Sequence, residues 1–190
     1  MFNQHLYKPL LIVLIAAIAG WLFIKIIFHR EKKRTVWEDL AELLFVLYGI
    51  VVAAVTIVPL PFAMHKTAGA QGINLVPLKN TIAIVRNVIN ANKDFLLPHL
   101  MQNIVGNVLL FIPLGFLLPV ISRKKISFLK VLLIGLFSSV AIESIQWIER
   151  GYGVYRSVDV DDVILNTVGT LLGWVGFYIA RIAIPGISKK

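Results

Sequence analysis

The stretch Leu132–Trp147, LLIGLFSSVAIESIQW, decides the fold, because it has the composition of a membrane-crossing helix and yet contains Glu143. A helix that crosses the hydrocarbon core needs about 20 predominantly apolar residues, and the segment reaches that length when it is extended back to Phe128. A carboxylate inside such a helix costs about 2.5 to 3.5 kcal/mol on insertion scales. Glu143 is therefore expected to face protein partners and is the first candidate for a functional residue.

The composition extends this interpretation to the whole chain. Of its 190 residues, 58% are hydrophobic, which exceeds the roughly 45–50% that is typical of soluble domains. The chain has no cysteine, which excludes a disulfide framework, a thiolate metal site and a cysteine nucleophile. The net charge of +9 is explained by basic cytoplasmic loops, so no nucleic-acid partner is expected. We predict an integral membrane protein.

Five apolar segments predict an all-α bundle of five transmembrane helices. In chain order they are Tyr7–Phe28, Trp37–Leu60, Leu100–Ile121, Phe128–Trp147 and Asp162–Ile184. The first is too long for the core of a signal peptide and is interpreted as a retained helix. The predicted organisation is an additional N-terminal helix with a basic cytoplasmic turn over residues 1–36, a membrane domain over 37–184, and a cytoplasmic tail over 185–190.

The basic residues predict how the bundle is oriented. Lysine and arginine gather after the first span, after the third span and at the C-terminus, and with five spans all three places fall on the same side. Short loops rich in these residues lie in the cytoplasm. We therefore expect a multi-pass protein of the plasma membrane with its N-terminus outside and its C-terminus in the cytoplasm.

The segment Pro61–His99 would then lie outside. Within it, Leu78, Ile82, Val85 and Ile89 recur at helical spacing. This pattern is typical of an amphipathic helix that lies in the membrane interface. An ordinary loop that covers the end of the bundle is the alternative.

Polar side chains of three spans are expected to meet at one depth near the outer surface. Asn103 and Asn107 share a helix face, as do Glu143 and Gln146. On the last span, Asp159, Asp162 and Asn166 share a face if the helix begins early enough, whereas Asp161 should point elsewhere and be solvated. Gly169 and Gly173 form a pair that favours close helix packing. Lipid cannot satisfy these polar groups, so we expect them to face one another or a wet cavity.

Several chemical interpretations of this cluster stay open. The asparagines suit interhelical hydrogen bonds, the aspartates suit helix caps, and Glu143 suits an ion pair with Arg150 or Arg156. The same oxygen atoms would suit a divalent cation, although no cofactor is evident. Glu143 would also suit a general base, which makes it the candidate catalytic residue. Arg156 would suit bidentate binding of a phosphate or carboxylate.

Four blocks of the sequence, in this order, resemble the VanZ-like family of bacterial membrane proteins. They are Asn74–Leu78, Gln102–Phe116, Ile142–Gln146 and Arg156–Gly169, and the resemblance covers about Leu40 to Ala180. Its founding member is linked to resistance to teicoplanin, a lipoglycopeptide that binds cell-wall precursors. The resemblance implies a bacterial plasma-membrane protein whose matching site positions are Asn74, Asn103, Asn107, Glu143, Gln146, Arg156, Asp159, Asp162 and Asn166.

The sequence leaves two main functions open. The first is a resistance factor whose outward polar site binds a membrane lipid, a lipid-linked cell-wall component or the lipoglycopeptide itself. The second is an intramembrane enzyme that modifies an envelope lipid or cell-wall precursor with Glu143 as acid or base. A small transporter is less favoured, because five spans without an inverted repeat do not form a self-contained transporter.

Overall fold

The computed structural model describes Ile18, Leu22 and residues 36–56, 72–91, 97–122, 125–151 and 157–183. The predicted first span, its basic turn, Arg156 and the C-terminal tail lie outside these residues, apart from the two isolated positions. The described elements are α2 (Val36–Thr56), β1 (Ile73–Asn74), α3 (Lys79–Ala91), α4 (Leu97–Leu100), the π-helix η2 (Met101–Val105), α5 (Gly106–Ile121), α6 (Phe128–Gly151), β2 (Val158–Asp159) and α7 (Val160–Ala183).

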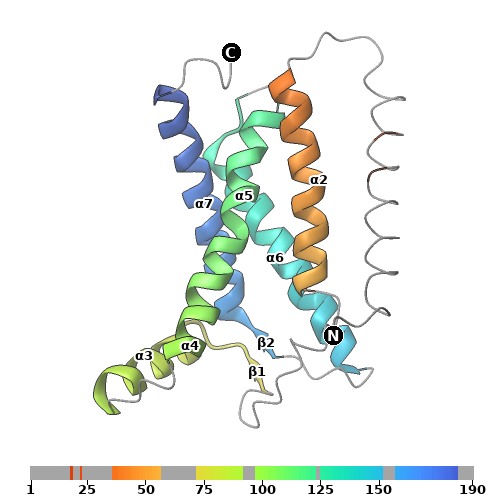
Figure 1. Cartoon of the computed structure of the whole chain (residues 1–190). Helices are drawn as coiled ribbons and strands as arrows, with labels where there is room; N and C mark the ends of the chain where they lie inside the picture. The colour runs from red at the N-terminus through yellow and green to blue at the C-terminus, as the bar shows by residue number, and fades with distance from the viewer. Residues whose placement is uncertain are drawn as a thin grey trace, which may run out of the picture.

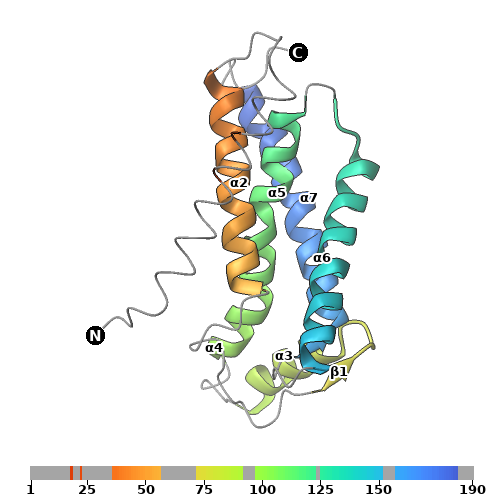
Figure 2. The same cartoon turned by 90° about the vertical axis from the view of Figure 1, so that its right-hand side faces the viewer.

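Four of these helices are long and apolar enough to cross a membrane. The spans are Asp39–Thr56, Asn103–Ile121, Phe128–Gly151 and Val160–Ala183, and they correspond to the second to fifth predicted spans. They stand side by side as an upright bundle in both Figure 1 and Figure 2. The prediction of a helical, multi-pass membrane protein is confirmed, and the first predicted span lies outside the described part of the chain, apart from Ile18 and Leu22.

Helix α7 packs most closely on α5, and two glycines make this approach possible. A Cβ atom added at Gly169 would lie 2.2 Å from the carbonyl oxygen of Val108, and one at Gly173 would lie 2.0 Å from that of Ile112. No real Cβ tolerates such contacts, so only glycine fits at either position. Close backbone approach through small residues is a standard way for helices to associate in lipid. The predicted packing role of this glycine pair is confirmed.

The apolar core lies between α2, α5 and α6. Phe111, Leu114 and Ile142 are buried together, and Phe45 and Tyr48 of α2 pack against them. The outward faces of the long helices remain apolar and exposed, as at Val51 of α2 and Phe137 of α6. Such faces fit helices whose solvent is lipid.

One end of the bundle carries the elements that do not span (Figures 1 and 2). Strand β1 pairs in parallel with β2, with Ile73 opposite Val158 and Asn74 opposite Asp159. These two-residue strands are absent from the all-α prediction, because a pair so short leaves no periodic signal in the sequence. After β1 the chain turns through Leu78, whose φ of 61° is rare for a residue with a branched side chain.

A helix, α3 (Lys79–Ala91), occupies the segment for which the sequence predicts an amphipathic helix. It projects sideways from the end of the bundle (Figure 1). Pro98, which follows α3 in the sequence, lies within the short helix α4. Helix α3 lies against α4 and the beginning of α7, where the polar side chains gather.

Candidate functional site

Asp159 is the centre of a buried polar cluster at this end of the bundle. Its side chain is 4% exposed. Its Oδ1 accepts hydrogen bonds from Nδ2 of Asn74 at 2.7 Å and from the backbone N–H of Asp161 at 2.9 Å. Its Oδ2 accepts a third, from Nδ2 of Asn80 at 2.7 Å. The bond to Asp161 makes Asp159 the N-cap of α7, as the sequence predicts.

Glu143 approaches the same residue from α6. Its side chain is 8% exposed, and its Oε2 accepts a hydrogen bond from the backbone N–H of Asp159 at 3.0 Å. The interior of α6 is thereby joined to the residue that caps α7. The expected meeting of Asn74, Glu143 and Asp159 is therefore observed in the structure.

The structure contradicts the prediction for Asp161. The sequence places it on another face and in solvent, but its side chain is 1% exposed. Its carboxylate accepts hydrogen bonds from the backbone N–H of Leu78, from the backbone N–H of Thr81 at 3.0 Å and from the hydroxyl of Thr81 at 2.8 Å. Asp161 caps the first turn of α3 from a distant part of the chain. Helix-face spacing missed this because the partner is a loop segment outside the bundle.

Asp162 joins α7 to α5. The Nδ2 atom of Asn107 donates a hydrogen bond to Oδ1 of Asp162 at 2.6 Å. The carboxylates of Glu143, Asp159 and Asp161 lie close enough to repel the charge of Asp162. Four carboxylates thus gather where α6, α7 and the β1–α3 segment meet.

One turn deeper, Asn166 faces α6. Its side chain is 3% exposed, and its Nδ2 donates a hydrogen bond to the hydroxyl oxygen of Ser139 at 2.8 Å. Its Oδ1 is buried and has no donor among the residues that the structure describes. A buried amide oxygen without a donor is uncommon in a folded protein, so Asn166 marks a point in the cluster where a further hydrogen bond can be accepted.

The other predicted residues lie differently. Gln146 is buried, but its Nε2 donates to the backbone oxygen of Thr56 at 2.8 Å, so it joins α6 to the end of α2. Asn103 lies in η2 and is half-buried, and no hydrogen bond joins its side chain to another described residue. Arg156 lies outside the described residues, so its predicted role stays a prediction.

Sequence analysis did not identify three contributions to the cluster: those of Asn80 and Thr81, and the buried role of Asp161. Asn80 and Thr81 begin α3, where polar residues are common for local reasons. Ser139 lies one turn before Glu143 on the same face of α6, and this spacing predicts that the two share a face.

A divalent cation needs several oxygen ligands around one point. Within the described ranges, no three His, Cys, Asp or Glu side chains are arranged to hold a metal ion. The carboxylates of Asp159, Asp161 and Asp162 instead accept hydrogen bonds from different parts of the chain.

Comparison with known proteins places the chain in a family. No curated protein and no solved structure gave a significant match. The family model for VanZ/LLP1 matches residues 45–181, which is most of the 190-residue chain and includes α5, α6, most of α7 and the whole polar cluster. The chain belongs to the VanZ/LLP1 family.

Proposed function

We propose that this protein contributes to resistance to lipoglycopeptide antibiotics such as teicoplanin by binding a ligand at the Glu143–Asp159 cluster. The observation that carries the proposal is the burial of Glu143, at 8% exposure, within a helix long and apolar enough to cross the membrane. Intramembrane carboxylates are rare and usually functional. The family's link to teicoplanin resistance supplies the biological context.

The ligand would be an amphiphile, either a lipid-linked cell-wall component or the lipoglycopeptide. The cluster lies at one end of an apolar bundle (Figure 1), so an acyl chain can remain in the bilayer while the polar part reaches the cluster. Amide and carboxylate groups pair with the hydroxyl and amide groups of such a molecule. The proposed contacts are Asn74, Asn103, Asn107, Glu143, Gln146, Arg156, Asp159, Asp162 and Asn166.

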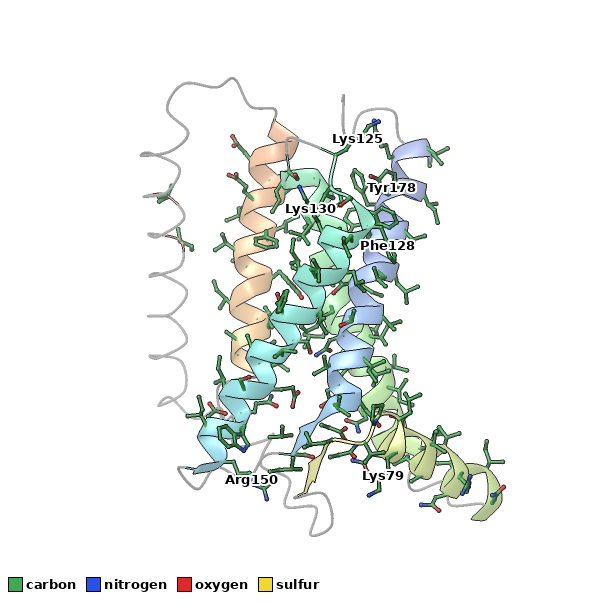
Figure 3. The ribbon with its side chains drawn as sticks, turned by 180° about the vertical axis from the view of Figure 1, so that it is seen from behind. Lys79, Lys125, Phe128, Lys130, Arg150 and Tyr178 are labelled. Atoms are coloured by element: carbon green, nitrogen blue, oxygen red, sulfur yellow. The ribbon has the colours of Figure 1, made fainter. Side chains whose placement is uncertain are left out.

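We place the cluster at the outer surface of the plasma membrane. Lys125 and Lys130 lie at the opposite end of the bundle, as Figure 3 shows, next to the basic turn that begins at Arg123. Short basic turns favour the cytoplasmic side. An outward cluster would meet cell-wall precursors and the antibiotic directly.

The test is expression in a susceptible bacterium. Wild-type protein should raise the teicoplanin concentration needed to stop growth, and Glu143→Gln should remove that effect, because it deletes the charge and keeps a side chain of the same shape. Ser144→Ala is the matched control, since Ser144 is an exposed neighbour that bonds only the carbonyl of Val140 within the described residues. Unchanged susceptibility with correctly inserted wild-type protein would overturn the proposal.

The proximity of Asp162 to Glu143, Asp159 and Asp161 favours one alternative, an intramembrane enzyme that acts on an envelope lipid or cell-wall precursor. Neighbouring carboxylates often divide into a general acid and a general base. Mass spectrometry of envelope lipids would separate the two functions. A lipid species that depends on both the protein and Glu143 would support the enzyme, whereas identical lipid profiles would leave binding as the function.

A further inference from the structure

Helix α3 carries a stripe in which basic and apolar side chains alternate. Lys79, Ile82, Arg86 and Ile89 recur at intervals of three and four residues and therefore share one side of the helix. All four are exposed; Ile82 is 51% exposed and Ile89 is 71% exposed. The segment 72–91 contains no aspartate or glutamate, so no acidic side chain of this segment offsets the charge of the stripe.

The orientation of the stripe is fixed by the polar cluster. Asn80 and Thr81 lie on another side of α3 and bond to Asp159 and Asp161. These contacts hold the first turn of α3 against the bundle, and the helix then extends sideways from the end of the bundle (Figure 1). With the four apolar helices crossing the membrane, that end of the bundle lies at its surface. The alternating stripe is consequently presented at the level of the lipid headgroups and not to the protein core.

We propose that the Lys79–Ile82–Arg86–Ile89 stripe binds the anionic headgroups of phospholipids in the membrane that holds the bundle. The isoleucines would enter the boundary between headgroups and acyl chains, and the ammonium and guanidinium groups would bind phosphate oxygens. Charge complementarity selects anionic phospholipids over zwitterionic ones, because each basic residue near an anionic surface gains about 1 kcal/mol, or about fivefold in binding. This inference does not depend on the proposed function.

The absence of cysteine allows a direct test with the full-length chain. An environment-sensitive fluorophore is attached at Ile89→Cys, on the stripe, or at Asn87→Cys, an exposed position on a different side of α3. The protein is placed in phosphatidylcholine vesicles or in equimolar phosphatidylcholine and phosphatidylglycerol, and acrylamide quenching is measured. We expect the probe at position 89 to be shielded relative to that at 87, and more strongly in the anionic vesicles.

Charge substitutions identify the cause of the shielding. Lys79→Gln with Arg86→Gln should remove the difference between the two vesicle compositions at position 89. Lys125→Gln with Lys130→Gln makes the same change in net charge at the opposite end of the bundle (Figure 3) and should leave that difference unchanged. Equal quenching at positions 89 and 87, or equal shielding in both compositions, would overturn the proposal.

Discussion

The backbone N–H of Asp159 donates a hydrogen bond of 3.0 Å to Oε2 of Glu143. This bond connects the interior of α6 to the residue that caps α7, and the same Asp159 binds Asn74 and Asn80 through its side chain. A single carboxylate inside the membrane domain thus stabilises the junction of two spans with the segment that leads to α3. The hydrogen bond that satisfies the buried carboxylate of Glu143 also holds the candidate site together.

Glu143 should therefore affect stability as well as function. Glu143→Ala leaves the Asp159 N–H buried without an acceptor, which costs about 1–3 kcal/mol. Glu143→Gln keeps an acceptor and should be close to wild type. Thermal unfolding of the purified protein in detergent distinguishes the two variants, and equal melting temperatures for Ala and Gln would show that this bond contributes nothing.

Asp161→Ala should loosen α3 without unfolding the bundle. The substitution removes the three hydrogen bonds made by Leu78 and Thr81. Hydrogen bonds to charged groups contribute about 1.5–3 kcal/mol each, so amide exchange in residues 78–91 should accelerate at least tenfold. Exchange in α5 and α7 is the internal reference, and protection of α3 equal to wild type would contradict the capping role.

Gly173→Ala tests the contact between α5 and α7. Its added Cβ would lie 2.0 Å from the backbone oxygen of Ile112, so the helices must separate. Overpacking of this kind costs about 1–3 kcal/mol or more. Gly49→Ala is the matched control, because a Cβ there meets no atom of the described residues within 4 Å and should be neutral or stabilising by the higher helix propensity of alanine. Similar melting temperatures for both variants would contradict the close approach.

Substitutions at Asn166 and Ser139 distinguish a structural role of this pair from a role in ligand binding. Replacing both, as Asn166→Leu with Ser139→Ala, removes a hydrogen-bonded pair together and should change stability little. It also removes the Oδ1 atom that has no donor among the described residues. We expect a folded protein that no longer raises teicoplanin tolerance, and full tolerance in this variant would place ligand binding elsewhere.

The sequence predicts the spans well because apolar length is a local property. It also identifies Glu143 and Asp159, since a buried charge requires partners wherever they lie, and the resemblance to the VanZ-like family adds Asn74. It fails for the burial of Asp161 and for the bonding partner of Gln146 for one physical reason. Helix periodicity says which residues share a face but not what that face meets, and here Asp161 meets the first turn of α3 while Gln146 meets the end of α2. The short β1–β2 pair is not predicted from the sequence for a related reason, because its hydrogen bonds depend on the tertiary fold.

A lipid-linked cell-wall component bound at the Glu143 cluster would be withheld from the antibiotic, so the proposed function lowers the amount of teicoplanin held at the cell surface. The most direct measurement is the quantity of fluorescent teicoplanin bound per cell, at equal membrane levels of wild-type protein, Glu143→Gln and Ser144→Ala. We predict reduced binding with wild type and Ser144→Ala, and binding equal to that of cells without the protein for Glu143→Gln. Reduced teicoplanin binding that persists in cells with Glu143→Gln would contradict the proposed function.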